Sequence, residues 1–193
     1  ACTYSTDDGL DTADRIAEAQ NLLVEPAPLP PDASNWEFIY SESAAFPHET
    51  IVLGEYCSGN KFENNPSTSL TTYLTAFDHN LDLTQPHQDT FIEIRGLQAN
   101  SNIRCVLLSA FTSRCITTVR MNIAVQPYRN GKPVESARQV INARIEEVSR
   151  SGGFCNSIPP AIRHVNDRVS AELIEKISNA LQNPEVPIGE VSS

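Results

Sequence analysis

Five cysteines are the residues of this sequence best suited to do chemistry, and their spacing limits what that chemistry is. They are Cys2, Cys57, Cys105, Cys115 and Cys155. No two of them have C-x-x-C spacing, which argues against a zinc ribbon or a thioredoxin-type redox site. Widely spaced cysteines favour disulfides, which persist in exported proteins and are rare in the cytosol. The alternative is five reduced, buried cysteines in a cytosolic protein.

Four of these cysteines are expected to form two disulfides. Cys105 and Cys115 flank an apolar segment, and closing a loop of that size stabilises a protein by roughly 2.5–3 kcal/mol. Cys57 and Cys155 would then pair, tying the first strand region to the entry of the last helix. Four cysteines allow three connectivities, so the sequence leaves the pairing open. A reactive thiol is the functional alternative, but it requires a neighbouring base, and none is evident.

Cys2 is the expected lipidation site. Ala1 is tolerated before the lipidated cysteine of bacterial lipoproteins, and a polar, proline-rich stretch follows Cys2. Thr3 in place of an aspartate fits retention in the outer membrane. A triacylated cysteine carries more than one lipid chain, which is enough for stable anchoring. The alternatives are an ordinary cysteine or a disulfide partner, and a processed lipoprotein would begin at Cys2 itself.

Residue types that bind metal ions gather in one polar stretch, at Asp78, His79, Asp82, His87 and Asp89. Their spacing matches neither an EF-hand nor an H-E-x-x-H motif, and such residues are common in solvated loops. We therefore predict no metal site and no cofactor. A metal-dependent hydrolase using this stretch is the weakest alternative function.

Charged residues on predicted strands are the last candidates for catalysis: Glu93 with Arg95, and Glu146 with Glu147. The outer face of a half-buried sheet explains them equally well. The sequence contains no nucleophile elbow, P-loop or dinucleotide-binding glycine pattern. We predict no catalytic residues and a non-enzymatic protein.

Apolar periodicity predicts the elements that position these residues. Helices are expected at 11–23, capped by Asp11, from Ser67 through Phe77, and from Pro159 to about Leu181. Strands are expected at 36–40, 50–56, 90–97, 115–128 and 134–147, and 103–111 is ambiguous between strand and short helix. Residues 59–66 and 78–89 are expected to be polar loops. This order predicts an α+β two-layer sandwich, with helices on one face of a mostly antiparallel sheet that contains a long β-hairpin.

The turn of that hairpin follows from its apolar pattern. The apolar sets of the two strands are odd-numbered: Val119, Met121, Ile123 and Val125 in the first, and Ala137, Ile141, Ala143 and Ile145 in the second. A two-residue loop at Asn130–Gly131 would pair odd residues with even ones, and a slip of one residue moves every side chain to the other face. We therefore predict a three-residue loop, 129–131, with Gly131 in the left-handed conformation.

Composition indicates one folded domain with tails. We divide the 193 residues into an N-terminal tether with a short helix and proline-rich spacer (1–35), an α+β domain (36–183) and a flexible tail (184–193). The net charge of −10 argues against nucleic-acid binding and against anionic lipid headgroups. The longest apolar run, 105–111, is far shorter than the roughly 20 residues of a transmembrane helix. A signal peptide is expected to have been removed from the mature chain.

The second half resembles a bacterial group. TVRMNIAVQPYRNGKPVESARQVINARIEEV, followed by AIRHVNDRVSAELIEKISNAL, resembles the auxiliary lipoproteins of envelope ABC-type lipid transport systems and related small outer-membrane lipoproteins. FIEIRGLQ and STSLTTYLTAF stand where such proteins have their preceding strand and helix, although the cysteines and the apolar segment 103–113 depart from the pattern. The resemblance implies a lipid-anchored periplasmic accessory that contacts protein partners in a transport or assembly complex. The alternative is a secreted module that binds an apolar ligand between helix and sheet.

Overall fold

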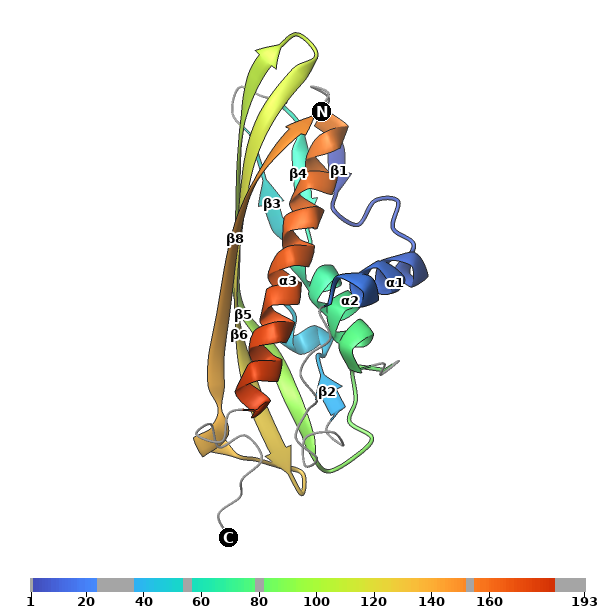
Figure 1. The fold of residues 1–193 in the computed structure, drawn as a ribbon, viewed down its shortest axis with the longest axis vertical. Coiled ribbons are helices and arrows are strands. Elements are labelled where there is room, and N and C mark those ends of the chain that lie inside the picture. Colours follow the sequence, from blue (N-terminus) through green and yellow to red (C-terminus); the bar gives the residue numbers. More distant parts are fainter. Residues whose placement is uncertain (1, 24–36, 54–56, 79–81, 152–154, 183–193) are drawn as a thin grey trace.

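A long antiparallel sheet forms the centre of the computed structural model, which describes residues 2–23, 37–53, 57–78, 82–151 and 155–182. Strand β6 (Thr112–Arg129) pairs with β5 (Phe91–Ser109) on one side and with β8 (Gln139–Ser151) on the other. Helix α3 (Ile158–Gln182) runs along one face of this sheet, and the other helices lie on the same side (Figure 1). The predicted α+β sandwich is confirmed.

The core lies between α3 and the sheet because both elements carry a continuous apolar stripe. Odd-numbered residues of β6 point toward α3, and Val119, Met121 and Ile123 are completely buried. The helix contributes residues at positions spaced by three or four, the spacing of one helical face. These are Ile162, Val165, Val169, Leu173 and Ile177. The expected stripe therefore packs on the long hairpin, as its length required.

Shorter elements complete the structure around this sandwich. β1 (Thr3–Ser5), β4 (Lys61–Asn64) and β3 (Glu49–Ile51) form a small second sheet in that order, and β2 (Glu37–Ile39) pairs in parallel with β5. Helix α1 (Thr12–Leu22) contacts helix α2 (Pro66–Asp78). The remaining elements are the 3₁₀ turns η1 (Glu42–Ala44), η2 (Glu135–Ala137) and η3 (Cys155–Ser157) and the two-residue strand β7 (Lys132–Pro133).

The described part of the predicted N-terminal tether is packed on the body. The Asp11 side chain caps α1 by accepting hydrogen bonds from the backbone N–H groups of Ala13 (3.0 Å) and Asp14 (3.2 Å). Ala19 of this helix is buried in the main core, and β1 adds in parallel to the edge of β4. The proline-rich spacer, 24–36, and the tail, 184–193, lie outside the described residues.

Two further predictions about local structure need correction or resolution. The predicted loop at 59–66 contains strand β4, in which Phe62 and Asn64 are buried between more exposed neighbours. A four-residue strand with one large apolar side chain is too short to produce a recognisable alternating pattern. The ambiguous segment 103–111 is resolved as strand, because β5 continues to Ser109 before it turns into β6.

The predicted three-residue loop is wrong, although the face assignment that motivated it is right. Arg129 pairs with Lys132, so the loop is the two residues Asn130 and Gly131, both with positive φ (50° and 72°) as in a type I′ turn. Continuing that pairing would place Val140 opposite Met121. The structure places Ala143 there, three residues later. The 3₁₀ turn η2 takes up these three residues and returns both apolar sets to the core face.

Candidate functional site

Both disulfides lie at one end of the molecule, around a second hydrophobic cluster. Cys57 bonds to Cys155 and Cys105 bonds to Cys115, which is the pairing that the sequence suggested among three possibilities. Partly buried Tyr4 and three of the four disulfide cysteines pack on this cluster, and the fourth, Cys115, belongs to it. Its other members are Ile51, Leu53, Phe62, Ile103, Ile158 and Ile162. Disulfides of this kind indicate an extracytoplasmic location.

Cys2 lies at this same end and has a free, exposed thiol. All five cysteines are within the described residues, and Cys2 alone is in no disulfide. Its N–H donates to Asn60 Oδ1 (3.0 Å), and its carbonyl accepts a hydrogen bond from the N–H of Lys61 (3.0 Å). Two residues later, the ring of Tyr4 stacks on Phe62 with centroids 5.6 Å apart. Residues 2–4 are therefore held against the disulfide end.

The β5–β6 hairpin extends past the rest of the sheet at this end (Figure 1) and finishes in exposed apolar side chains. We call residues 106–112 the apolar tip. Val106, Leu107, Leu108 and Phe111 in it are 63%, 60%, 54% and 75% exposed. The Cys105–Cys115 disulfide joins the two strands directly below the tip. The sequence predicted the disulfide here but gave no sign that the apolar segment projects from the molecule.

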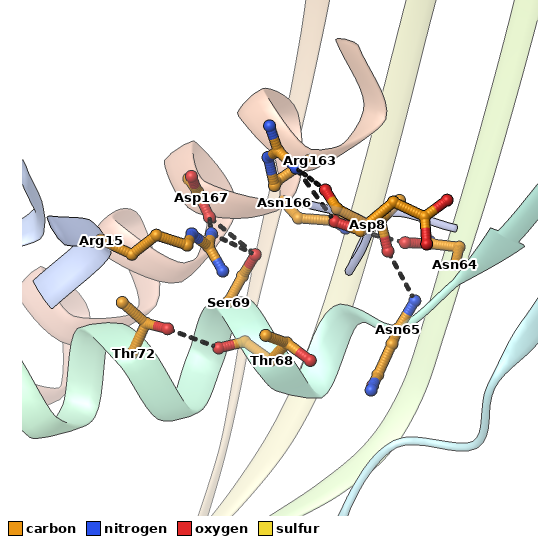
Figure 2. A network of polar contacts seen from close by, with 11 residues as sticks. Asp8, Arg15, Asn64, Asn65, Thr68, Ser69, Thr72, Arg163, Asn166 and Asp167 are labelled. Atoms are coloured by element: carbon orange, nitrogen blue, oxygen red, sulfur yellow. Dashed lines mark hydrogen bonds and ion pairs between the residues drawn. The ribbon is translucent and has the colours of Figure 1, made fainter. Parts of the chain in front are cut away.

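A polar network joins three helices near the middle of the molecule (Figure 2). Arg15 of α1 forms an ion pair with Asp167 of α3, and the Ser69 hydroxyl of α2 donates to Asp167 Oδ1 (2.7 Å). Arg15 also donates to Ser69 Oγ (3.4 Å), so the three side chains form one closed set of contacts. Sequence reasoning missed this site because its members come from helices far apart in the chain.

The same network continues toward the small sheet. The buried Asn166 side chain donates to Asn64 Oδ1 (2.8 Å), and Asn64 donates in turn to Ser101 Oγ (2.8 Å). The Arg163 guanidinium donates to the backbone carbonyls of Thr6 and Asp8, both at 3.3 Å. Polar residues beside the apolar stripe of α3 were the available signal, because a buried amide or guanidinium requires a partner. These contacts hold the N-terminal segment against α3, which is a structural role.

A groove of about 760 Å³ lies beside α2, lined by residues of α1, α2 and the segments 40–48 and 82–84. Most of the α2 side chains in it are hydroxyls, and Tyr40 Oη is 2.8 Å from Ser67 Oγ. Burial raises the pKa of Tyr40, which keeps its hydroxyl protonated and makes it a poor base. The groove is not the predicted apolar site between helix and sheet, where core side chains such as Met121 and Val169 pack.

Two of the candidate metal-binding residues, Asp82 and His87, make other contacts. Glu37 accepts hydrogen bonds from the backbone N–H groups of His87 (2.6 Å) and Gln88 (2.8 Å), and its carboxylate lies 3.2 Å from the His87 ring. Hydrogen bonds from Thr84 lower the pKa of Asp82. His79 lies outside the described residues. Within the described part of the chain, no three histidine, cysteine, aspartate or glutamate side chains gather in a metal-binding arrangement.

The charged residues on the strands are also paired. Glu93 and Arg95 form an ion pair on β5 (3.2 Å). Glu147 forms ion pairs with His164 (2.9 Å) and Arg168 of α3. Glu146 contacts Arg144 and accepts from the Thr118 hydroxyl (3.1 Å). The structure therefore does not bring the two predicted groups together.

Comparisons with known proteins give little information on identity. No family model matches the sequence, and no curated protein matches it either. Among solved structures, the chain is similar to a minor lipoprotein from Acinetobacter baumannii, at 14% identity and a TM-score of 0.36, covering 64% of this chain and 81% of that one. That similarity is too distant to carry an argument about function. No helix in the described ranges is both long and apolar enough to cross a membrane.

Proposed function

We propose that this protein is a non-enzymatic, lipid-anchored accessory of the bacterial cell envelope that works by contact with protein partners. The observation that carries the proposal is the state of Cys2. Its thiol is free and exposed, while the other four cysteines are consumed in disulfides. A lipid on this sulfur would project from the disulfide end without disturbing the fold, because the Cys2 backbone already has its hydrogen-bond partners.

The absence of catalysis is supported by how the described polar groups are used. Arg15, Ser69 and Asp167 contact one another and join three helices. The buried phenols of Tyr40 and Tyr73 have raised pKa values, whereas a general base working near neutral pH needs a lowered one. A structural role accounts for each group without an appeal to a reaction.

A protein partner is expected at the free edge of the main sheet. Among the described strands, β8 pairs only with β6, which leaves the backbone of its other edge available to a partner strand. Its outward side chains include Val140 and Val148, 54% and 55% exposed, on either side of charged Arg144 and Glu146. Strand addition at such an edge is a recurring mode of recognition, and the complex would be the transport or assembly type that the resemblance implies.

Mass spectrometry of the protein purified from its own host tests the anchor. We expect a chain that begins at Cys2 and carries both thioether-linked diacylglycerol and an N-acyl group. The Cys2→Ser variant should keep its fold, because neither disulfide involves Cys2, and a high-salt wash should release it from membranes that retain the parent protein. An unmodified Cys2 in native protein would remove the anchor from this proposal.

Site-specific photocrosslinking in the same host tests the partner edge. A photoreactive residue at Val140 of β8 should give a discrete crosslinked species with an envelope protein. The matched control is Glu18, an exposed position on α1 far from β8 in the fold, which should give none. Equal crosslinking from both positions, or none from either, would contradict a docking edge at β8.

A further inference from the structure

The apolar tip is unusual because its exposed side chains are large, contiguous and free of charge. No charged residue occurs between Cys105 and Ser113. Single exposed apolar residues are normal on protein surfaces, but a contiguous group at the end of a projecting hairpin marks an interaction site. Four such side chains stand in solvent here, namely Val106, Leu107, Leu108 and Phe111.

A disulfide at the base and hydrogen bonds at the turn constrain the tip. The Cys105–Cys115 disulfide and the buried Ile103 fix its base against the second cluster. At the turn, the hydroxyl oxygens of Ser109 and Thr112 lie 2.7 Å apart, and the Phe111 N–H donates to Ser109 Oγ (3.2 Å). A preorganised surface loses little conformational entropy when it binds. Transfer of these apolar side chains into an apolar environment would therefore cost little conformational entropy.

Charge is unevenly distributed along the chain, and the tip lies in a basic region. Between residues 94 and 134 there is no aspartate or glutamate, although the whole chain carries a net charge of −10. The same stretch contains six basic residues: Arg95, Arg104, Arg114, Arg120, Arg129 and Lys132. The net charge of the whole chain therefore does not describe the charge of these two strands, and it is no argument against anionic lipids at the tip.

Three exposed arginines form a collar directly below the tip. Arg114 of β6 lies opposite Val106 of β5 on one side and opposite Arg150 of β8 on the other. Arg104 lies two residues before Val106 on β5 and therefore on the same outer face of the sheet. Among the described residues, none of the three has an ion-pair partner. Along β8 the next carboxylate on this face is Glu146, which Arg144 and Thr118 already contact.

We propose that the apolar tip inserts into the interface of an anionic phospholipid bilayer, while Arg104, Arg114 and Arg150 bind the headgroup phosphates. Apolar side chains flanked by guanidinium groups match the order of acyl region and phosphate layer across a membrane surface. Guanidinium groups bind phosphate through paired hydrogen bonds. A protein partner would need complementary acidic groups around a narrow apolar socket, whereas a bilayer supplies both features along its whole surface.

This inference goes beyond the proposed anchor and does not depend on it, although the two are geometrically compatible. Tyr4, two residues after Cys2, and the base of the tip both pack on the second hydrophobic cluster, and β1 and the hairpin tip lie at the same end of the molecule (Figure 1). A lipid on Cys2 and an inserted tip would therefore reach the same leaflet. Two membrane contacts at one end would fix the orientation of the sandwich relative to the surface.

Vesicle binding by unlipidated Cys2→Ser protein tests the proposal separately from the anchor. Vesicles of phosphatidylcholine mixed with phosphatidylglycerol should sediment the protein, and vesicles of phosphatidylcholine alone should sediment much less. The double variant Leu108→Ser/Phe111→Ser should weaken binding more than about tenfold, because it removes two apolar side chains from the membrane. Leu97→Ser/Val140→Ser, with two exposed apolar residues far from the tip along β5 and β8, is the matched control and should bind normally.

Fluorescence locates the tip directly. In a Phe111→Trp protein with Trp36 changed to Phe, anionic vesicles should shift the emission to the blue, and brominated lipids should quench it. The triple variant Arg104→Gln/Arg114→Gln/Arg150→Gln should lose the preference for phosphatidylglycerol, while Arg144→Gln should keep it. Absence of an emission shift, or equal binding by the tip variant and its control, would overturn the proposal. Either result would leave the mass-spectrometric test of Cys2 unaffected.

Discussion

Arg15 of the first helix forms an ion pair with Asp167 of the last helix, and the two side chains are 8% and 21% exposed. Ser69 of the middle helix contacts both of them, so one charge pair links all three helices. A buried pair contributes little relative to an apolar replacement, but removing one member leaves a charge without compensation. The pair is therefore a sensitive point in the packing of the helical layer.

Replacing Arg15 with alanine should lower the free energy of unfolding by about 3 kcal/mol, because Asp167 would be left without its guanidinium partner. Urea denaturation followed by circular dichroism measures this change. The control is Arg144→Ala, which removes one member of a pair whose side chains are 54% and 53% exposed. That loss should stay below about 0.5 kcal/mol, and similar losses from both variants would show that burial of the Arg15 pair is unimportant.

The two disulfides should contribute unequally. Replacing Cys57 and Cys155 with alanine removes a crosslink that spans 98 residues and should cost about 4–5 kcal/mol in the chain-entropy model. Replacing Cys105 and Cys115 removes one that spans 10 residues and should cost about 2.5–3 kcal/mol. Urea midpoints of the two variants, compared with the parent, give the order. A larger loss for the short loop would contradict this loop-length argument.

Stability should fall at alkaline pH through Tyr73. Burial, reinforced by the negative charge of Asp167, raises the pKa of Tyr73 to about 12. In the unfolded chain a tyrosine releases its proton near pH 10, so between about pH 10 and 12 only the folded state retains it. The free energy of unfolding should thus be unaffected by this group below pH 10 and decrease as the pH rises toward 12.

A Tyr73→Phe variant isolates that contribution, because phenylalanine has no proton to release. Its stability should decline less steeply across this pH range than that of the parent. Both proteins should carry Cys2→Ser, which removes the free thiol that would exchange with the disulfides at high pH. Parallel stability curves for the two proteins would mean that Tyr73 ionises normally in the folded state.

Gly96 should not tolerate a side chain. A Cβ atom added there would lie 2.8 Å from Phe46 Cδ1 and 2.9 Å from the Phe46 backbone nitrogen. Because the backbone of the 41–48 segment would have to move, Gly96→Ala should destabilise the protein by about 1–3 kcal/mol. Thermal unfolding of this variant beside Gln98→Ala, an exposed position at the same β-bulge, provides the test. A stable Gly96→Ala protein would indicate that the segment moves easily.

Periodic apolar residues made most of the main sandwich predictable from the sequence. The stripe from Ile162 to Ile177 and the alternation from Val119 to Val125 each extend over many residues, so their pattern identifies both the element and its buried face. The odd-numbered positions of Ile141 and Ala143 also placed both residues correctly on the core side of the sheet. The odd-numbered pattern did not determine the turn. A two-residue loop followed by a 3₁₀ turn pairs odd residues with odd residues, as a three-residue loop does.

Contacts between distant segments were beyond the reach of a local pattern. Strand β4 is short, and its partners β1 and β3 carry no clear alternation. The pairing of Arg15 with Asp167 spans 152 residues, and nothing in either helix alone selects that partner. The exposure of the apolar tip could not be predicted either. A run of apolar residues normally indicates burial, and only the complete fold shows that no other element covers this one.

The way the N-terminal segment is held has a consequence for when the chain can finish folding. Strand β1 finds its hydrogen-bonding partner only in β4. The backbone carbonyls of Thr6 and Asp8 accept hydrogen bonds from Arg163, which follows them by more than 150 residues. A chain that crosses a membrane with its N-terminus leading would emerge long before those partners do. Its first residues would stay unpaired until α3 arrived, so in such a chain native structure would form only after translocation was nearly complete.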